Sequence, residues 1–260
     1  SSDIGAALAK YWVSEGYSVS GTFRKKSFIT KELEALGINL YYLDLNSSKS
    51  CSELIGKIPN DYSWDTLIIG AGDLNPVGPF AQTNFKLWEV SLRINFTGQL
   101  EVLQKLIPLA KAKTNPSPVC LFFAGGGTNG AVKNYSAYTI SKIASIKMVE
   151  LLDAEIKDIS FTILGPGRVE TKIHKATLDS SFEIIGEEFY KTKEMLDNDL
   201  CYPIKNVIKC CNWLIHQERD LISGRNFSAV HDPWDQDKIL KIIENPNIFK
   251  LRRYGNDFFI

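Results

Sequence analysis

The chain has 260 residues, of which 44% are hydrophobic and 23% are charged, and its 30 basic residues balance 30 acidic ones. This length suits one large α/β domain, and the composition is that of an ordinary globular protein rather than a disordered one. The balanced charge gives no global attraction to nucleic acid or to an anionic membrane, and the apolar runs are far shorter than a bilayer span requires.

Short apolar segments alternate with longer amphipathic ones along the chain. The short segments, which we predict to be strands, are Tyr17–Phe23, Asn39–Leu43, Thr66–Ile69, Val119–Phe123, Ser160–Leu164 and Arg225–Val230. Apolar residues at helical spacing predict helices at Ile4–Glu15, Thr30–Leu36, Lys49–Ile58, Leu87–Ala112, Ala137–Lys157 and Val207–His216. Strands separated in this way by helices indicate a parallel sheet covered on both faces. We therefore predict a single domain over residues 1–260, an α/β three-layer sandwich around a doubly wound parallel sheet.

The beginning of the sequence departs from this scheme. Residues 1–5 (Ser-Ser-Asp-Ile-Gly) lead directly into a helical pattern, and no strand candidate precedes it. In a doubly wound sheet the first strand is central, and its loss would expose two unpaired edges that a marginally stable domain does not tolerate. We therefore expect that a first strand, which the sequence as given lacks, belongs in front of the first helix.

Glycines follow three of the predicted strands. They stand in the tripeptides Gly70-Ala71-Gly72, Gly125-Gly126-Gly127 and Gly165-Pro166-Gly167. Ligands of open α/β sheets bind outside the carboxyl ends of the strands, and glycine lets the backbone approach a ligand where a side chain would block it. The pattern predicts a cofactor cleft at this edge of the sheet. The alternative is that the glycines only form tight turns after the strands.

Tyr138 and Lys142 are four residues apart within a predicted helix, so both lie on one face about one turn apart. A phenol with a pKa of about 10 is a poor acid or base at neutral pH, and a nearby ammonium group lowers that pKa. Such a tyrosine can protonate a carbonyl oxygen as hydride arrives, or deprotonate an alcohol in the reverse direction. Because this pattern arises by chance in a chain of this size, its context has to supply the specificity.

Further segments supply that context. Residues 1–5 end like a glycine-rich phosphate loop with Asp3 at its middle glycine, and the others are Leu43-Asp44-Leu45, Asp65–Gly72, Asn95 within Arg-Ile-Asn-Phe-Thr-Gly, and Gly165–Thr171. With Tyr138 and Lys142, these segments resemble the short-chain dehydrogenase/reductase family over nearly the whole chain. Ile69 and Gly70 replace the two asparagines of that family's Asn-Asn-Ala-Gly strand end.

The resemblance implies a Rossmann-like fold and hydride transfer between a nicotinamide cofactor and a carbonyl or secondary alcohol. It implies that Tyr138 and Lys142 are catalytic and that Asn95 anchors a water-mediated proton relay from the lysine. It also implies that the cofactor contacts Ser2, Asp3, Ile4, Gly5, Asp44, Leu45, Gly70, Ala71, Gly72, Tyr138, Lys142, Pro166, Gly167, Val169 and Thr171, the last of these at the nicotinamide amide.

One catalytic position departs from the family pattern. Gly125 stands where the family has a serine that hydrogen-bonds the substrate carbonyl, and Thr128 is the nearest hydroxyl, with Ser136 as another stand-in. The loss of one such donor typically costs about 10²–10³ in rate rather than all activity. We therefore expect an NAD(P)-dependent oxidoreductase in which Thr128, a backbone N–H or water polarises the carbonyl. A catalytically impaired NAD(P)-binding protein is the alternative. A sugar-nucleotide epimerase or dehydratase would share the Tyr138–Lys142 chemistry, but such enzymes normally need a larger C-terminal domain.

The residues at the end of the strand candidate Tyr17–Phe23 and just after it indicate which cofactor is preferred. An acidic residue there would accept the ribose hydroxyls of NAD, but Thr22 is followed by Arg24, Lys25 and Lys26. These cations suit the 2′-phosphate of NADP, so we predict NADP in preference to NAD. A solvated basic loop is the alternative interpretation.

The remaining expectations concern partners and location. The family carries a mobile substrate lid where residues 168–200 stand here, and members form homodimers or homotetramers through helices that correspond to 87–112 and 137–157. The five scattered cysteines form no disulfide framework, and the three histidines are not spaced as metal ligands, so we expect no metal and reduced thiols in a cytoplasmic protein. We expect a small-molecule substrate and neither nucleic acid nor a membrane as a partner.

Overall fold

Strands and helices alternate along the chain as the sequence periodicity predicts. The computed structural model describes residues 2–111, 116–180 and 182–255. Its strands are β1 (Ser20–Phe23), β2 (Asn39–Tyr42), β3 (Thr66–Ile69), β4 (Val119–Phe123), β5 (Ser160–Gly165) and β6 (Arg225–Ser228). Its longer helices are α1 (Asp3–Ser14), α2 (Phe28–Ala35), α3 (Ser48–Ile55), α4 (Phe85–Leu92), α5 (Gly98–Leu106), α6 (Ser136–Glu155), α9 (Glu187–Asp197) and α10 (Ile204–Leu214).

All paired strands run parallel, as predicted, but they lie in two sheets. β1 pairs with β2, and a second sheet has the order β3-β4-β5-β6. Within the described ranges β1 and β3 do not pair with each other, so the single continuous sheet of the prediction is interrupted between them. The carboxyl ends of β3 to β6 meet at one edge, because parallel neighbours in register end together.

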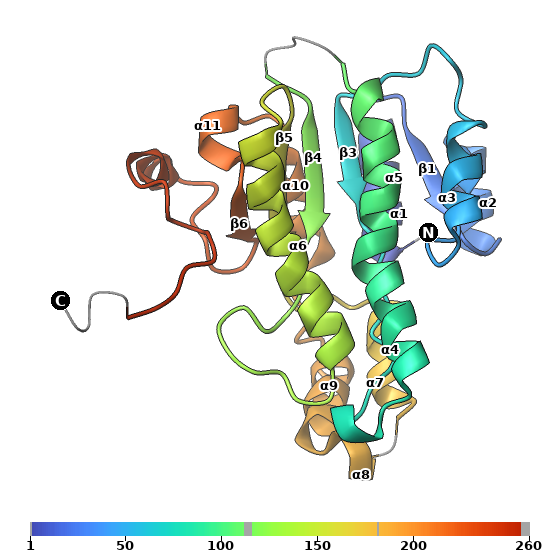
Figure 1. The fold of residues 1–260 in the computed structure, drawn as a ribbon, viewed down its shortest axis with the longest axis vertical. Helices are drawn as coiled ribbons and strands as arrows, with labels where there is room; N and C mark the ends of the chain where they lie inside the picture. Colours follow the sequence, from blue (N-terminus) through green and yellow to red (C-terminus); the bar gives the residue numbers. More distant parts are fainter. Residues whose placement is uncertain (1, 112–115, 181, 256–260) are drawn as a thin grey trace.

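Helices cover both faces of the larger sheet, and β4 shows the division residue by residue. Leu121 and Phe123 pack with α1 and α10, whereas Cys120 and Phe122 pack with α5 and α6. A strand buried on both faces reads as a continuous apolar run, which is why Val119–Phe123 shows no alternation. Figure 1 shows α5 and α6 in front of the strands, with α1 and α10 behind them. No helix in the described part of the chain combines the length and the apolar character that a bilayer crossing needs.

Helix α1 joins the two sheets into one body. Its Leu8 and Trp12 belong to the core between α1, β4 and α10, while its Ala6 packs on the other side against Leu33 and Ile38 near β1 and β2. The amino end of α1 is thereby fixed beside the carboxyl ends of the strands. Ser2 caps this end by accepting a hydrogen bond from the Gly5 N–H at 3.1 Å.

The prediction of one continuous helix over Leu87–Ala112 is wrong. The structure has α4, a π-helical turn over Arg93–Thr97, then α5 and a 3₁₀ turn over Ile107–Leu109 that contains Pro108. Side-chain amides bond the helix backbone in and around the π turn, since Asn95 donates to the Ser91 carbonyl and Gln99 to the Ile94 carbonyl, both at 3.0 Å. Single π turns of this kind occur frequently at functional sites. The predicted end at Ala112 lies outside the described residues.

Residues 168–200, predicted as a substrate lid, fold as short helices beyond the strand ends. They comprise a 3₁₀ turn at Lys172–His174 and the helices α7 (Lys175–Leu178), α8 (Phe182–Ile185) and α9. Figure 1 shows these helices below the carboxyl ends of β3 and β4. The buried hydroxyls of Tyr135 and Thr177 hydrogen-bond at 2.9 Å and join this segment to the start of α6.

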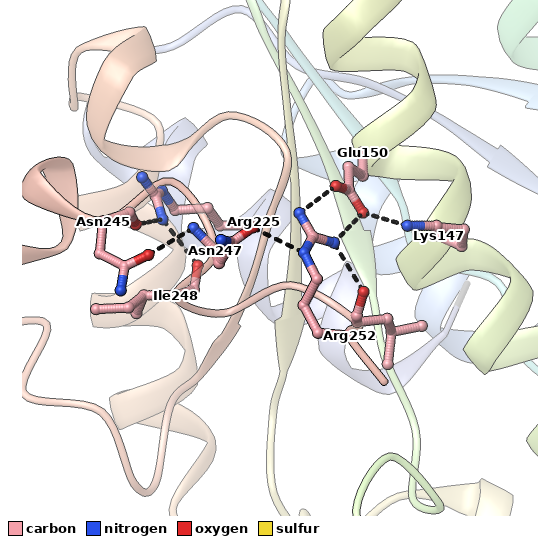
Figure 2. A network of polar contacts seen from close by, with 8 residues as sticks. Lys147, Glu150, Arg225, Asn245, Asn247, Ile248 and Arg252 are labelled. Atoms are coloured by element: carbon pink, nitrogen blue, oxygen red, sulfur yellow. Dashed lines mark hydrogen bonds and ion pairs between the residues drawn. The ribbon is translucent and has the colours of Figure 1, made fainter. Parts of the chain in front are cut away.

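The C-terminal residues 245–252 return to α6 and β6 through two arginines (Figure 2). Arg252 pairs with Glu150 at 2.7 Å, and hydrogen bonds from Arg252 and then Lys147 hold the pKa of Glu150 at about 2. Buried Arg225 donates to the carbonyls of Asn245 and Ile248 in this segment and to that of Ile242 just before it. These contacts fix the chain at residues 249–251 against the sheet.

The cysteine prediction agrees with the structure. Cys51, Cys120, Cys210 and Cys211 are buried as free thiols, and Cys201 is partly buried. Burial raises the pKa of the Cys120, Cys210 and Cys211 thiols, so they are neutral and unreactive in the folded core.

Candidate active site

A cavity of about 1820 Å³ opens at the carboxyl edge of β3 to β6. It extends from the amino end of α1 to the first turn of α6 and the 168–200 segment. Of the residues expected at the site, those that line it are Ser2, Asp3, Ile4, Arg24, Gly70, Ala71, Gly72, Thr128, Tyr138, Lys142, Pro166, Gly167, Val169 and Thr171. The structure thus brings together residues from five separate parts of the chain.

Four expected residues do not line this cavity: Gly5, Asp44, Leu45 and Asn95. The Gly5 N–H is used by the cap on α1, and an added side chain would be blocked because its Cβ would lie 2.6 Å from the Ser2 Oγ. Asp44 turns back on its own loop, where its Oδ1 accepts from the Asn46 N–H at 3.0 Å.

Tyr138 and Lys142 lie together on the face of α6 that meets the carboxyl end of β4. Lys142 is 3% exposed, and its Nζ donates to the Phe123 carbonyl at 3.0 Å. The same Nζ lies 5.6 Å from the centroid of the Tyr138 ring, within the range of a cation–π contact. The predicted proximity is therefore present, but the ammonium group approaches the ring rather than bonding the phenol oxygen.

The pKa values of the pair correct the expected electrostatics. Burial raises the pKa of Tyr138 to about 12, and burial lowers the pKa of Lys142 to about 8. We predicted that Lys142 would lower the tyrosine pKa. In this structure desolvation outweighs that attraction, because removing the phenolate from water costs more than a cation at the ring face returns. Tyr138 is consequently neutral at pH 7.

Gly125 provides the space in which Tyr138 sits. A Cβ at this position would lie 2.8 Å from the Tyr138 Cε1, 2.9 Å from its Oη and 2.9 Å from the Lys142 Cγ. Atoms at those distances overlap, so this arrangement of the pair requires glycine. The residue where the family has its serine is thus matched to the observed positions of Tyr138 and Lys142.

The two hydroxyls considered as replacements for that serine lie differently. Thr128 lines the cavity, and its hydroxyl makes no hydrogen bond to any described residue. Ser136 does not line the cavity, and its Oγ accepts from the Trp88 indole N–H at 3.1 Å. Of the two, only Thr128 faces the space that a substrate would occupy.

Asn95 lies at the centre of the π turn and is completely buried. Its Oδ1 accepts from the Asp73 N–H at 2.9 Å, and its Nδ2 donates to the Asp73 carbonyl at 2.8 Å and to Ser91. The side chain is therefore fully used in fixing the loop after β3, which includes Gly72. Any part that Asn95 takes in proton transfer would have to involve its backbone.

The cavity has the features that a dinucleotide needs. The N–H groups of Asp3 and Ile4 lie in the first turn of α1, where helix N–H groups have no intrahelical acceptor, and such groups bind phosphate. Arg24 lies at the carboxyl end of β1 and lines the same cavity, whereas Lys25 and Lys26 do not. The residues present fit a nicotinamide dinucleotide, except for the carboxylate of Asp3 at the amino end of α1.

Several cavity residues were not found from the sequence. Phe249, Lys250 and Leu251 line it together with Asn226, whose Oδ1 is buried without a partner among the described residues. No local sequence pattern predicts that the C-terminal segment packs against β6. Across the described ranges, no group of His, Cys, Asp and Glu side chains has the arrangement of a metal site.

Comparison with known proteins agrees with this geometry. The short chain dehydrogenase pgmD of Aspergillus terreus is 25% identical over 235 residues, which cover 81% of this chain and 68% of that protein. A solved short chain dehydrogenase/reductase of Saccharomyces cerevisiae matches with a TM-score of 0.77 at 19% identity, covering 90% of this chain and 94% of that one. A short chain dehydrogenase of Shigella flexneri, solved complexed with NADP, matches with a TM-score of 0.71 at 20% identity, covering 87% and 92%.

The family itself is established by the match to a family model rather than by any single relative. The family model described as short chain dehydrogenase matches residues 1–181, which include β1 to β5 and the Tyr138–Lys142 pair. The solved structures, at about one fifth identity, show the same fold independently. This chain belongs to the short chain dehydrogenase family of oxidoreductases.

Proposed function

We propose that this protein is an NADP(H)-dependent oxidoreductase that transfers hydride between the cofactor and a carbonyl or secondary alcohol, with Tyr138 as its acid/base. The observation that carries the proposal is the single cavity in which Tyr138, Lys142, Arg24 and the amino end of α1 meet. The NADP present in the Shigella flexneri structure, which has the same fold, supports the choice of cofactor.

The proton step follows from the state of Tyr138. The bound nicotinamide supplies the hydride. With its pKa at about 12, the phenol is neutral at pH 7 and donates its proton to the carbonyl oxygen that becomes the alcohol. Thr128 lines the same cavity, and we propose that it donates a hydrogen bond to the same oxygen. In the reverse direction the phenol must first lose its proton, which the position of Tyr138 in the first turn of α6 favours through the helix dipole.

Turnover tests this proposal directly. We expect the purified protein to consume NADPH, followed by its nicotinamide absorbance, with at least one member of a panel of ketones, aldehydes and oxidised sugars. Tight NADPH binding without turnover on any of these substrates would instead support a non-catalytic binding protein.

Arg24 provides the first specific prediction, on cofactor choice. Arg24→Ala is expected to weaken NADPH affinity about tenfold and to leave NADH affinity unchanged, because only NADPH carries a 2′-phosphate that a guanidinium can bind with two hydrogen bonds. Affinities are measured by cofactor fluorescence. Lys25→Ala, which removes a neighbouring cation outside the cavity, is the matched control, and an equal loss in both variants would contradict a specific role for Arg24.

Gly125 separates a working enzyme from an impaired one. Gly125→Ser is expected to lower turnover and to destabilise the protein by about 1–3 kcal/mol, because the new Cβ displaces Tyr138 and Lys142 from their observed positions. Gly126→Ser is the control, since a Cβ there meets only Val132 at 3.8 Å. Steady-state kinetics and urea denaturation measure the two effects. A gain of activity in Gly125→Ser would show that the chain lacks only the family's serine hydroxyl.

Assembly and location belong to the same proposal. Exposed apolar side chains on α4 and α6, namely Leu87, Ile140 and Leu151, support a homodimer or homotetramer formed through these helices. The buried, reduced thiols support a cytoplasmic protein. Several polar and charged residues of the 168–200 segment line the cavity, among them Arg168, His174 and Lys175, and we propose that this segment covers a small-molecule substrate.

A further inference from the structure

The amino end of α1 carries a carboxylate that already has a cationic partner. The Oδ2 of Asp3 accepts from the backbone N–H of Lys172 at 2.6 Å, and its Oδ1 lies 3.3 Å from the Lys172 Nζ. These contacts join the first turn of α1 to the 168–200 segment, 169 positions later in the sequence. Both residues line the cavity.

The position of this carboxylate coincides with the part of the cavity best suited to phosphate. A helix amino end carries partial positive charge and open N–H groups, and it stabilises one nearby anion. Asp3 is that anion in the structure, and Ser2 already occupies the Gly5 N–H. A diphosphate at the same helix end would lie beside this carboxylate and would compete with it for the Lys172 ammonium group.

We infer that Asp3 and Lys172 form a latch in which Asp3 competes with the cofactor diphosphate for Lys172. This inference rests on the proposed NADP(H) function. Without nucleotide, Lys172 pairs with Asp3 and holds the 168–200 segment against α1. With nucleotide, Lys172 exchanges the carboxylate for a phosphate oxygen, so that cofactor binding is coupled to the position of this segment.

The exposure of the pair makes this exchange favourable. The Lys172 side chain is 69% exposed and that of Asp3 is 22% exposed, so the ammonium group is largely in water and the ion pair contributes little stability of its own. A diphosphate offers the ammonium group more negative charge than a single carboxylate does, and it also bonds the open N–H groups of α1. Asp3 therefore weakens cofactor affinity without preventing binding.

The test is a double-mutant cycle on NADPH affinity in the full chain. Asp3→Asn is expected to tighten NADPH binding about three- to tenfold, and Lys172→Gln to weaken it by a similar factor. In the Lys172→Gln background, Asp3→Asn is expected to change affinity less than about twofold, because the two side chains act on one interaction. Adenosine 2′-monophosphate, which has no diphosphate, is expected to bind wild type and Asp3→Asn alike.

A second measurement reports on the segment rather than on affinity. Amide hydrogen exchange of residues 168–180 is expected to accelerate in nucleotide-free Asp3→Asn, and addition of NADPH is expected to restore protection. Lys191→Gln is the control, since it removes a lysine of the same segment that pairs with Glu187 at 3.3 Å, the same distance as in the latch, but lies outside the cavity. It is expected to leave NADPH affinity unchanged.

The outcomes separate the latch from the function on which it rests. Equal gains from Asp3→Asn with and without Lys172 would show simple charge repulsion and overturn the latch, as would equal tightening of adenosine 2′-monophosphate. Unchanged NADPH affinity in Asp3→Asn, with wild type binding normally, would overturn the latch alone. If wild type and all variants bind neither NADPH nor NADH, the proposed function fails, and the latch fails with it.

Discussion

Replacing Tyr138 with phenylalanine is expected to lower kcat about 10³-fold while changing NADPH affinity less than about threefold. Burial raises the pKa of the Tyr138 phenol to about 12, so the phenol is neutral at pH 7 and can donate its proton into the cavity. The Lys142 ammonium group is instead bonded to the Phe123 carbonyl. Loss of a positioned general acid typically costs about 10²–10⁴ in rate. The aromatic ring, and with it the packing against Gly125, remains in the variant.

Tyr135→Phe is the matched control, because it removes a phenol hydroxyl only three residues earlier, at the N-cap of the same helix. The Tyr135 hydroxyl bonds Thr177 and is buried, so its loss is expected to affect the 168–200 segment and to cost less than about tenfold in kcat. Single-turnover kinetics with saturating NADPH distinguish the chemical step from product release. Equal losses in the two variants would contradict the assignment of Tyr138 as the acid.

The fold was largely predictable because strand and helix periods alternate clearly, and its errors have local causes. Strand β1 was predicted to begin at Tyr17 but begins at Ser20. The reason is that the Tyr17 N–H bonds the Trp12 carbonyl and Gly16 adopts a φ of +86° at the end of α1. This is a Schellman closure of the helix, which takes Tyr17 out of the strand. The break after α4 likewise depends on side-chain amides bonding the backbone, which hydrophobic periodicity does not report.

The parts of the site formed by residues close in sequence were predictable. The parts formed by residues far apart in sequence, which only the fold brings together, were not. Tyr138 and Lys142 share a face because they are one helical turn apart, and glycines mark the strand ends. The protonation of the pair depends instead on how deeply the packing of α6 on β4 buries it, which spacing alone does not contain. The Asp3–Lys172 contact between residues far apart in sequence has no local signal, and Asp44 faces its own loop rather than the cavity.

The buried ammonium of Lys142 gives the second large effect, on stability. Burial lowers the pKa of Lys142 from 10.5 to about 8, a difference that corresponds to about 3 kcal/mol. At pH 7 the folded protein therefore carries a charge that would be more stable in water. Lys142→Met, which keeps the length of the side chain without its charge, is expected to raise the free energy of unfolding by up to about 3 kcal/mol and to abolish turnover. Lost bonding to the Phe123 carbonyl offsets part of this gain.

The sign of the pH dependence follows from proton binding in the two states. Between about pH 8 and 10.5 the unfolded chain keeps a proton on Lys142 that the folded protein has released, so wild-type stability rises with pH relative to Lys142→Met. The advantage of the variant is thus greatest near pH 7 and disappears above pH 10.5. Urea denaturation of both proteins across this range measures the difference, in which the contribution of the shared cysteines cancels. Lys147→Met, an exposed lysine of the same helix, is expected to show no such convergence, and parallel curves for wild type and Lys142→Met would mean that Lys142 is not buried as a charged group.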